Sequence, residues 1–279
     1  MLISCSEKET KPNDEPKDDP VKWILLKNQK VSTNYLQDQN GVFNVFLPSD
    51  WETTKETYPV LYLFHGMGGD NNDWASNKVD AYMGPQGGDI VSATEIAVSQ
   101  GKIGRFIIIM PNAYNSFYVD GYDKMNYYES FFYKELVPFV EKTYPVKKGR
   151  VNTAIAGLSM GGFGASYYAF TNPDKYWLCY AMSGAVEGIG SPLTPSVKTI
   201  FETKGYNQSN FSTLPEYYMD CGSSDPLVLG SNRNTDAYLT SIGFPHSYKE
   251  FDGTHDWKYW KACYQRLIPL LAKNFKPAK

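Results

Sequence analysis

Short apolar runs alternate along the chain with longer amphipathic stretches, the pattern of strands separated by helices. The apolar runs predict strands at residues 31–35, 42–47, 60–64, 106–110, 151–157, 178–182, 217–220 and 247–251. The longer stretches between these runs predict helices at about residues 90–99, 129–143, 160–170, 196–203, 235–241 and 257–273, of which the one at 160–170 is rich in small residues. Gln39, Asn40 and Gly41 predict a hairpin turn between the first two strands. This order predicts an α/β fold, a mostly parallel sheet with helices on both faces, formed by a single domain over residues 21–279.

One of these strands runs directly into a serine that is flanked by glycines. The residues from Gly157 to Gly161 read G-L-S-M-G, the G-x-S-x-G pattern of a nucleophile elbow. Such a serine sits on a sharp turn between strand and helix, where side chains at the two glycine positions would collide with the backbone. We therefore predict Ser159 as a nucleophile at the carboxyl end of its strand.

A serine nucleophile needs a base, and the chain has three histidines. His255 follows the last predicted strand, at the sheet edge where the serine also lies. His65 lies on a glycine-rich loop and is predicted to be a structural, hydrogen-bonded residue. His246 precedes a strand, which places it at the opposite edge in a surface loop. We predict His255 as the base.

The base must be oriented by a carboxylate on its other ring nitrogen. Asp225 lies in the loop after the strand at residues 217–220, and it is the predicted acid. Asp220, at the end of that strand, is the alternative, whereas Asp252 and Asp256 are too near the histidine in sequence to reach its ring easily. The nucleophile, acid and base thus come in the chain order of α/β-hydrolases.

Acyl transfer also needs two backbone donors for the oxyanion. One is expected from the residue after the nucleophile, Met160. The other is expected from the loop His65-Gly66-Met67-Gly68-Gly69 after the third strand, through the backbone amide of Met67. The glycines allow this loop to come close to the serine.

Four motifs together resemble the esterase D-like group of α/β-hydrolases, which includes feruloyl and acetylxylan esterases. They are HGMGG at 65–69, GLSMGG at 157–162, CGSSD at 221–225 and GTHDW at 253–257, with Trp260 shortly after, and the resemblance covers roughly residues 60–273. It implies the roles predicted above: Ser159 as nucleophile, His255 as base, Asp225 as acid, and Met67 and Met160 as oxyanion donors. It further implies a serine esterase acting on feruloyl or acetyl esters of plant cell-wall polysaccharide through an acyl-enzyme.

The substrate slot is less well defined by the sequence. A feruloyl group needs a flat apolar slot, whereas an acetyl group needs a small one. The aromatic candidates for walling this slot are Trp74, Tyr118, Trp257 and Trp260, with Tyr114 and Tyr122 as further candidates. Similar motifs occur in S-formylglutathione hydrolases, siderophore esterases and mycolyltransferases. A non-catalytic carbohydrate-binding lipoprotein and a serine peptidase on the same scaffold are the alternatives from other classes.

Composition and charge narrow the range of partners. The net charge is −3, with 27 basic and 30 acidic side chains. The chain therefore lacks the excess of basic residues that is typical of nucleic-acid-binding proteins. The sequence contains no nucleotide-binding fingerprint and no cluster with metal-ligand spacing, so we expect neither cofactor nor metal. Cys179, Cys221 and Cys263 are scattered, and any disulfide among them is left open.

The first residues suggest a membrane anchor. Leu2-Ile3-Ser4-Cys5 resembles the lipobox of bacterial lipoproteins, in which the cysteine is acylated. Residues 6–20 are charged and proline-punctuated, as in a disordered linker. Only four residues precede Cys5, so we expect a truncated lipoprotein signal and attachment to a bacterial cell envelope. The alternative is a cytoplasmic protein with a chance match.

Overall fold

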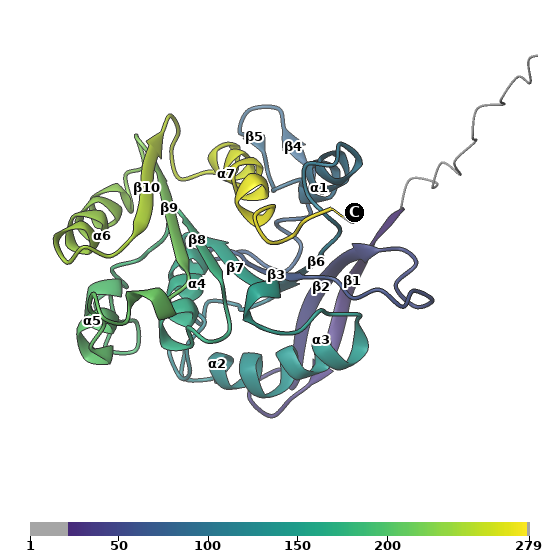
Figure 1. Ribbon diagram of the computed structural model, residues 1–279, viewed down its shortest axis with the longest axis horizontal. Helices are drawn as coiled ribbons and strands as arrows, with labels where there is room; N and C mark the ends of the chain where they lie inside the picture. Colours follow the sequence, from purple (N-terminus) through teal and green to yellow (C-terminus); the bar gives the residue numbers. More distant parts are fainter. Residues whose placement is uncertain (1–21, 278–279) are drawn as a thin grey trace, which may run out of the picture.

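The computed structural model describes residues 22–277 and is built on an eight-stranded sheet (Figure 1). The strand order is β1-β2-β6-β3-β7-β8-β9-β10, and the six strands from β6 to β10 run parallel. The strands are β1 Trp23–Ser32, β2 Asn40–Pro48, β3 Val60–Phe64, β6 Ile107–Pro111, β7 Thr153–Leu158, β8 Leu178–Met182, β9 Glu216–Gly222 and β10 His246–Phe251. The mostly parallel α/β sheet predicted from the sequence is confirmed.

Helices cover both faces of this sheet. Figure 1 shows α1 (Ile90–Ser99) and α7 (Trp257–Leu271) on one side of it. The other face carries α2 (Tyr128–Phe131), α3 (Val137–Thr143), α4 (Met160–Thr171), α5 (Val197–Lys204) and α6 (Leu229–Ser241). Each face has its own hydrophobic core. The two-layer covering follows from strands that are apolar on both sides.

The alternation of side chains along β3 shows how the two cores divide. Val60, Tyr62 and Phe64 point into the core beneath α2 to α6, whereas Leu61 and Leu63 point into the core beneath α1 and α7. All five side chains are buried, which is why the strand reads as one continuous apolar run.

The beginning of the sheet differs from the prediction. The first strand, β1, ends at Ser32, so the predicted strand at residues 31–35 is wrong over most of its length. The hairpin exists, but its loop spans residues 33–39, closed by a hydrogen bond from Thr33 N to Gln39 O at 3.0 Å. Leu36 is buried in the core, and its packing draws the loop inward.

Two helices also differ in detail. The predicted helix at residues 129–143 is helical throughout, but Phe132–Leu136 forms a π-helical turn between α2 and α3. Pro138 follows this turn and lacks the N–H that would bond one turn back, which accounts for the local change in helix type. Helix α6 begins at Leu229, six residues before its predicted start at residue 235.

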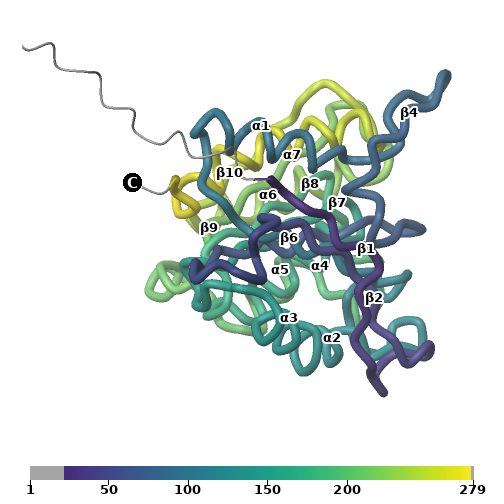
Figure 2. The backbone as a smooth tube through the Cα atoms, turned by 90° about the vertical axis from the view of Figure 1, so that its right-hand side faces the viewer, coloured from purple at the N-terminus to yellow at the C-terminus, as the bar shows by residue number. Residues whose placement is uncertain are grey.

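A short hairpin stands apart from the sheet. Its strands are β4 (Val79–Asp80) and β5 (Gly84–Pro85), and Figure 2 shows it projecting from the body of the molecule. The side chains of Tyr82 and Met83 at its tip are 98% and 72% exposed. Few packing contacts therefore hold the tip of this hairpin, whereas β5 lies against α7.

The predicted membrane anchor involves the N-terminal residues of the chain. The lipobox at Cys5 and the linker over residues 6–20 lie outside the described residues, so the envelope attachment stays a prediction. Within residues 22–277, no helix combines the length and the apolar character needed to cross a bilayer. Cys179, Cys221 and Cys263 are buried free thiols, so the question of a disulfide among them is answered.

Candidate active site

Ser159 occupies a sharp turn between β7 and α4. Its backbone has φ 51° and ψ −117°, a left-handed conformation that is strained for serine. Its N–H donates to Met182 O and its carbonyl accepts from Ala185 N, both at 3.0 Å, so the end of β8 and the loop after it hold the turn. The side chain is thereby presented at the carboxyl end of β7, as the elbow motif predicts.

The glycines on either side of this turn leave no room for a side chain. A Cβ at Gly157 would lie 2.3 Å from Gly161 O, and one at Gly161 would lie 2.5 Å from His65 O. These separations are far below van der Waals contact. The steric reason given for both glycines is confirmed.

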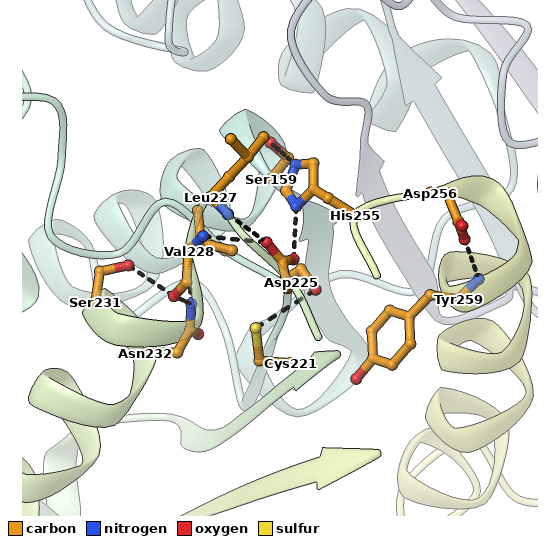
Figure 3. A network of polar contacts seen from close by, with 12 residues as sticks. Ser159, Cys221, Asp225, Leu227, Val228, Ser231, Asn232, His255, Asp256 and Tyr259 are labelled. Atoms are coloured by element: carbon orange, nitrogen blue, oxygen red, sulfur yellow. Dashed lines mark hydrogen bonds and ion pairs between the residues drawn. The ribbon is translucent and has the colours of Figure 1, made fainter. Parts of the chain in front are cut away.

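The structure brings the three predicted side chains together (Figure 3). His255 Nε2 lies 2.9 Å from Ser159 Oγ, and His255 Nδ1 lies 2.7 Å from Asp225 Oδ2. Because the carboxylate only accepts, Nδ1 carries the proton, and Nε2 is left to accept from the serine hydroxyl. This is the arrangement that general-base activation of a serine requires.

The acid is held as an anion. Asp225 has a fully buried side chain, and its Oδ1 accepts from the backbone amides of Leu227 at 2.9 Å and Val228 at 3.1 Å. Burial by itself would raise the pKa of Asp225, but the hydrogen bonds from His255 and these amides outweigh burial and hold the pKa below its ordinary value. The carboxylate is therefore ionised and ready to stabilise an imidazolium.

The loops that carry acid and base are bonded to each other. Ser223 N donates to Phe251 O at 2.8 Å, and Ser224 N donates to Gly253 O at 3.0 Å. Gly253 has φ 144°, and a Cβ there would lie 2.6 Å from the ring of Tyr259 in α7. This packing fixes the short loop on which His255 sits.

The other two histidines lie elsewhere. His246 is the first residue of β10, at the opposite end of the sheet from the serine, where its Nε2 contacts Asp236 Oδ1 at 3.0 Å. His65 is buried, with Nδ1 2.7 Å from Gly66 O and Nε2 accepting from Ala113 N at 2.9 Å. Burial lowers the pKa of His65 to about 4. His65 is the structural residue that was predicted, and His246 lies in a strand rather than in a surface loop.

The alternative acids are also committed to other contacts. Asp220 is buried and binds Arg266 Nε at 2.8 Å and the hydroxyl of Tyr180. Asp256 caps helix α7 by accepting from Tyr259 N at 2.9 Å. Neither carboxylate contacts His255.

A pocket of about 580 Å³ opens over the serine. Both predicted oxyanion residues, Met67 and Met160, line it together with Ser159 and His255. Within residues 22–277, the backbone N–H groups of both methionines have no hydrogen-bond acceptor. The amide of Met160 also lies at the N-terminus of α4, where the helix dipole favours negative charge.

Aromatic rings form part of the pocket wall. Trp257 and Trp260 line it as predicted, with ring centroids 5.3 Å apart and nearly perpendicular planes. Trp260 in turn packs edge-on against the His255 ring at 4.9 Å. Further apolar residues of the wall were missed by the sequence reasoning, among them Phe117, Ile189 and Leu227. Leu227 was within reach, because it lies two residues after the predicted acid.

Two predicted substrate contacts are corrected. Trp74 is fully buried, with its indole N–H donating to Phe64 O at 2.9 Å. Tyr118 is also fully buried, and its hydroxyl donates to His65 O at 3.0 Å. Both side chains belong to the packed interior and do not line the pocket. Tyr114 and Tyr122 do not line it either, and they pack against the core that contains Tyr118.

The pocket also holds two polar side chains, Asp73 and Gln86. The Asp73 carboxylate accepts a long hydrogen bond of 3.2 Å from Asp70 N, and no ion pair to it is found among residues 22–277. Burial raises the pKa of Asp73 to about 6. The same described region contains no group of three or more metal-ligating side chains.

The fold and this site together define an α/β-hydrolase of the esterase class. The chain belongs to the esterase family whose model is described as "Putative esterase", which matches residues 33–269. The resemblance seen in the sequence motifs is thus confirmed.

Named relatives agree with this assignment. The chain is 27% identical to an acetyl esterase of Caldicellulosiruptor saccharolyticus, over 80% of this chain and 86% of that one. It is 28% identical to an endo-1,4-beta-xylanase/feruloyl esterase of Xylanibacter ruminicola, over 82% of this chain and 29% of that longer protein. Among solved structures, a ferulic acid esterase superimposes with a TM-score of 0.75 at 28% identity, covering 91% of this chain and all of that one.

Proposed function

We propose that this esterase hydrolyses feruloyl or acetyl esters of plant cell-wall polysaccharide, with Ser159 as nucleophile, His255 as base and Asp225 as orienting acid. The single observation that carries the catalytic part is the continuous chain of hydrogen bonds from Asp225 through His255 to Ser159 at the pocket floor. A serine held at a strained turn, with base and ionised acid aligned behind it, is suited to acyl transfer.

The first chemical step forms an acyl-enzyme. Ser159 Oγ attacks the ester carbonyl while His255 Nε2 takes the hydroxyl proton, and Asp225 stabilises the resulting imidazolium. The carbonyl oxygen becomes an oxyanion that accepts from the backbone amides of Met67 and Met160. Collapse of this intermediate breaks the ester C–O bond, and His255 gives its proton to the departing alcohol.

The second step releases the acid. Water attacks the acyl carbonyl while His255 again accepts a proton, and the same two amides hold the oxyanion. Collapse returns the proton to Ser159 Oγ and frees the carboxylic acid. Each proton taken by the histidine is returned, so the enzyme ends as it began.

A feruloyl group is the acyl group that the pocket favours. The pocket volume of about 580 Å³ and its wall of Phe117, Trp257 and Trp260 offer apolar surface for a flat aromatic ring. The xylanase/feruloyl esterase and ferulic acid esterase relatives support the same substrate class. The acetyl alternative is supported by the acetyl esterase relative, of which the match covers 86%.

The test compares the full chain with Ser159→Ala on methyl ferulate and on acetylated xylan. We expect ferulate release by the wild type and a loss on the order of 10⁴-fold or more in turnover for the variant. Release of acetate alone would keep the mechanism and move the substrate to acetylated polysaccharide. An active Ser159→Ala variant would refute the assigned nucleophile, and a wild type inactive on both esters would refute the substrate class.

A further inference from the structure

The direction of the Met67 amide depends on the carbonyl at the other end of its peptide group. That carbonyl, Gly66 O, lies 2.7 Å from His65 Nδ1 and accepts from Gly69 N at 3.1 Å. The N–H and C=O of a trans peptide point in opposite directions. Holding the Gly66 carbonyl on one side therefore aims the Met67 N–H to the other.

The imidazole that makes this contact is fixed in turn. Ala113 N donates to His65 Nε2 at 2.9 Å, so Nε2 carries no proton and Nδ1 is the donor to Gly66 O. The hydroxyl of Tyr118 donates to His65 O at 3.0 Å. His65 is 1% exposed, and its ring is held on both nitrogens.

A third contact holds the far side of the turn. Gly68 N donates to the side-chain oxygen of Asn115 at 2.8 Å. Packing does little here, because the Met67 side chain is 58% exposed and a Cβ at Gly68 would meet nothing within 4 Å. The turn is thus held by hydrogen bonds on both sides of Met67.

The contacts made by Ala113, Asn115 and Tyr118 come from one segment, residues 113–118, which follows β6. Three of its residues, Tyr114, Phe117 and Tyr118, have positive φ between 52° and 61°. Its turns are closed by Asn112 Oδ1, which accepts from Tyr114 N at 2.9 Å, and by Ser116 Oγ, which accepts from Tyr118 N at 3.1 Å. Such a strained backbone persists only when its surroundings determine it fully, and strain of this kind concentrates at functional sites.

We propose that His65 and Asn115 are positioning residues for the oxyanion, which act together to aim the Met67 amide at the reacting carbonyl. The inference rests on the proposed esterase function and adds to it the residues that orient one of the two oxyanion donors. Neither side chain lines the pocket over the serine. Hydrogen bonds in such a series also polarise one another, so the His65 contact makes the Met67 N–H a stronger donor.

The first experiment uses two substitutions of His65 that keep different halves of its bonding. His65→Asn places an amide near Nδ1 and keeps the donor to Gly66 O, whereas His65→Gln reaches the Nε2 position and keeps only the acceptor for Ala113 N. For His65→Gln we expect kcat on p-nitrophenyl acetate to fall on the order of a hundredfold. For His65→Asn we expect kcat to fall by only about tenfold, and KM should change little in both variants.

The second experiment uses Asn115, which is exposed, so its variants are expected to fold even where a His65 variant does not. We expect Asn115→Ala to lower kcat by about tenfold and Asn115→Asp, which keeps the acceptor, to restore most of it. The matched control is Asn152→Ala, which removes a hydrogen bond to Lys148 O at the opposite end of β7 and should leave kcat unchanged.

The deciding readout is the inhibition constant of phenylboronic acid, whose tetrahedral serine adduct places an oxygen in the oxyanion site. In Asn115→Ala and His65→Gln, we expect this inhibition constant to rise by the same factor by which kcat falls. Equal kcat for the two His65 variants, or an unchanged inhibition constant in Asn115→Ala, would overturn the inference while an inactive Ser159→Ala still upholds the proposed function. An active Ser159→Ala would remove both.

Discussion

The two sides of Ser159 are built on different principles. On one side, the proposed acid Asp225 and base His255 meet the serine through their side chains, on loops that follow β9 and β10. On the other side, the predicted oxyanion donors are backbone amides, and the side chains proposed to orient Met67 are His65, after β3, and Asn115, after β6. The acid and base side is specified by which residues are present. The oxyanion side is specified by how the backbone is bent.

This difference determines what each side tolerates. A side-chain acid or base has no substitute, so a single change removes its chemistry. A backbone amide survives any substitution of its own residue except by proline, and otherwise it is lost only when its supports change. Mutations on the first side should therefore act directly on turnover, and those on the second should act through geometry and stability.

The largest effect is expected on the acid and base side, for Asp225→Asn. An asparagine can donate to Nδ1 and so favour the wrong histidine tautomer, which should lower kcat by about 10⁴-fold at little change in KM. Steady-state kinetics on methyl ferulate checks this. Asp252→Asn, an exposed aspartate of the histidine loop, is the control. A loss below tenfold would show that Asp225 does not orient the base.

The next largest effect is expected on the oxyanion side, where buried His65 should make the protein less stable at acidic pH. Burial lowers the pKa of folded His65 to about 4, whereas the unfolded chain binds a proton near 6.5. Below pH 6.5 the unfolded chain therefore binds a proton on His65, whereas the folded protein does not. The free energy of unfolding consequently falls as the pH is lowered to about 4, by roughly 3 kcal/mol in total.

Urea unfolding of wild type and His65→Asn between pH 7 and pH 4.5 isolates this effect as a difference. The wild type should lose more stability than the variant over that range. Parallel pH dependences would mean that folded His65 binds a proton as readily as the unfolded chain does, which would contradict the neutral tautomer assigned to it.

Gly161 is where the two sides meet, because it lies beside the nucleophile and against His65 O. Gly161→Ala should force β3 and α4 apart, costing about 1–3 kcal/mol of unfolding free energy and lowering kcat as the oxyanion loop moves. Gly230→Ala in α6 is the matched control, since a Cβ there meets nothing within 4 Å and should stabilise by up to about 1 kcal/mol. Equal stabilities of the two variants would contradict the close approach.

The smallest effect is expected at Asp73. An ionised carboxylate accepts a hydrogen bond from a substrate hydroxyl more strongly than a protonated one does. Because its pKa is about 6, kcat/KM for methyl ferulate relative to methyl cinnamate should rise severalfold from pH 5 to pH 7. Asp73→Asn should remove this rise. A ratio independent of pH in the wild type would exclude a contact between Asp73 and the phenol.

The sequence was informative where residue type decides the outcome. The runs at β3 and β8 were predicted to the residue, because strands buried on both faces are continuously apolar. The three side chains that the structure brings together could be chosen because each candidate had to follow a strand at one edge of the sheet. The position of β1 was wrong: the strand begins at Trp23 with the apolar run Trp-Ile-Leu-Leu, which the prediction passed over, and only Val31 and Ser32 of the predicted strand belong to it.

The contacts of the oxyanion side could not be predicted in the same way. Tyr118 was expected at the substrate because it is an aromatic residue in a loop, but a positive φ of 61° turns it into the core. Phe117, its neighbour, lines the pocket instead. Left-handed conformations at non-glycine residues leave no signal in the sequence, so the direction of each side chain in this segment depended on the tertiary structure.

The exposed tip of the β4–β5 hairpin is a place where the chain can be cut into two fragments. This tip is held by few contacts, so a protease that recognises aromatic residues should cut first at Tyr82. The pieces before and after that cut interlock, because β3 lies between β6 and β7. Two separately made fragments meeting at Tyr82 should therefore reassemble into an active esterase, and the same site should accept new termini in a circular permutant.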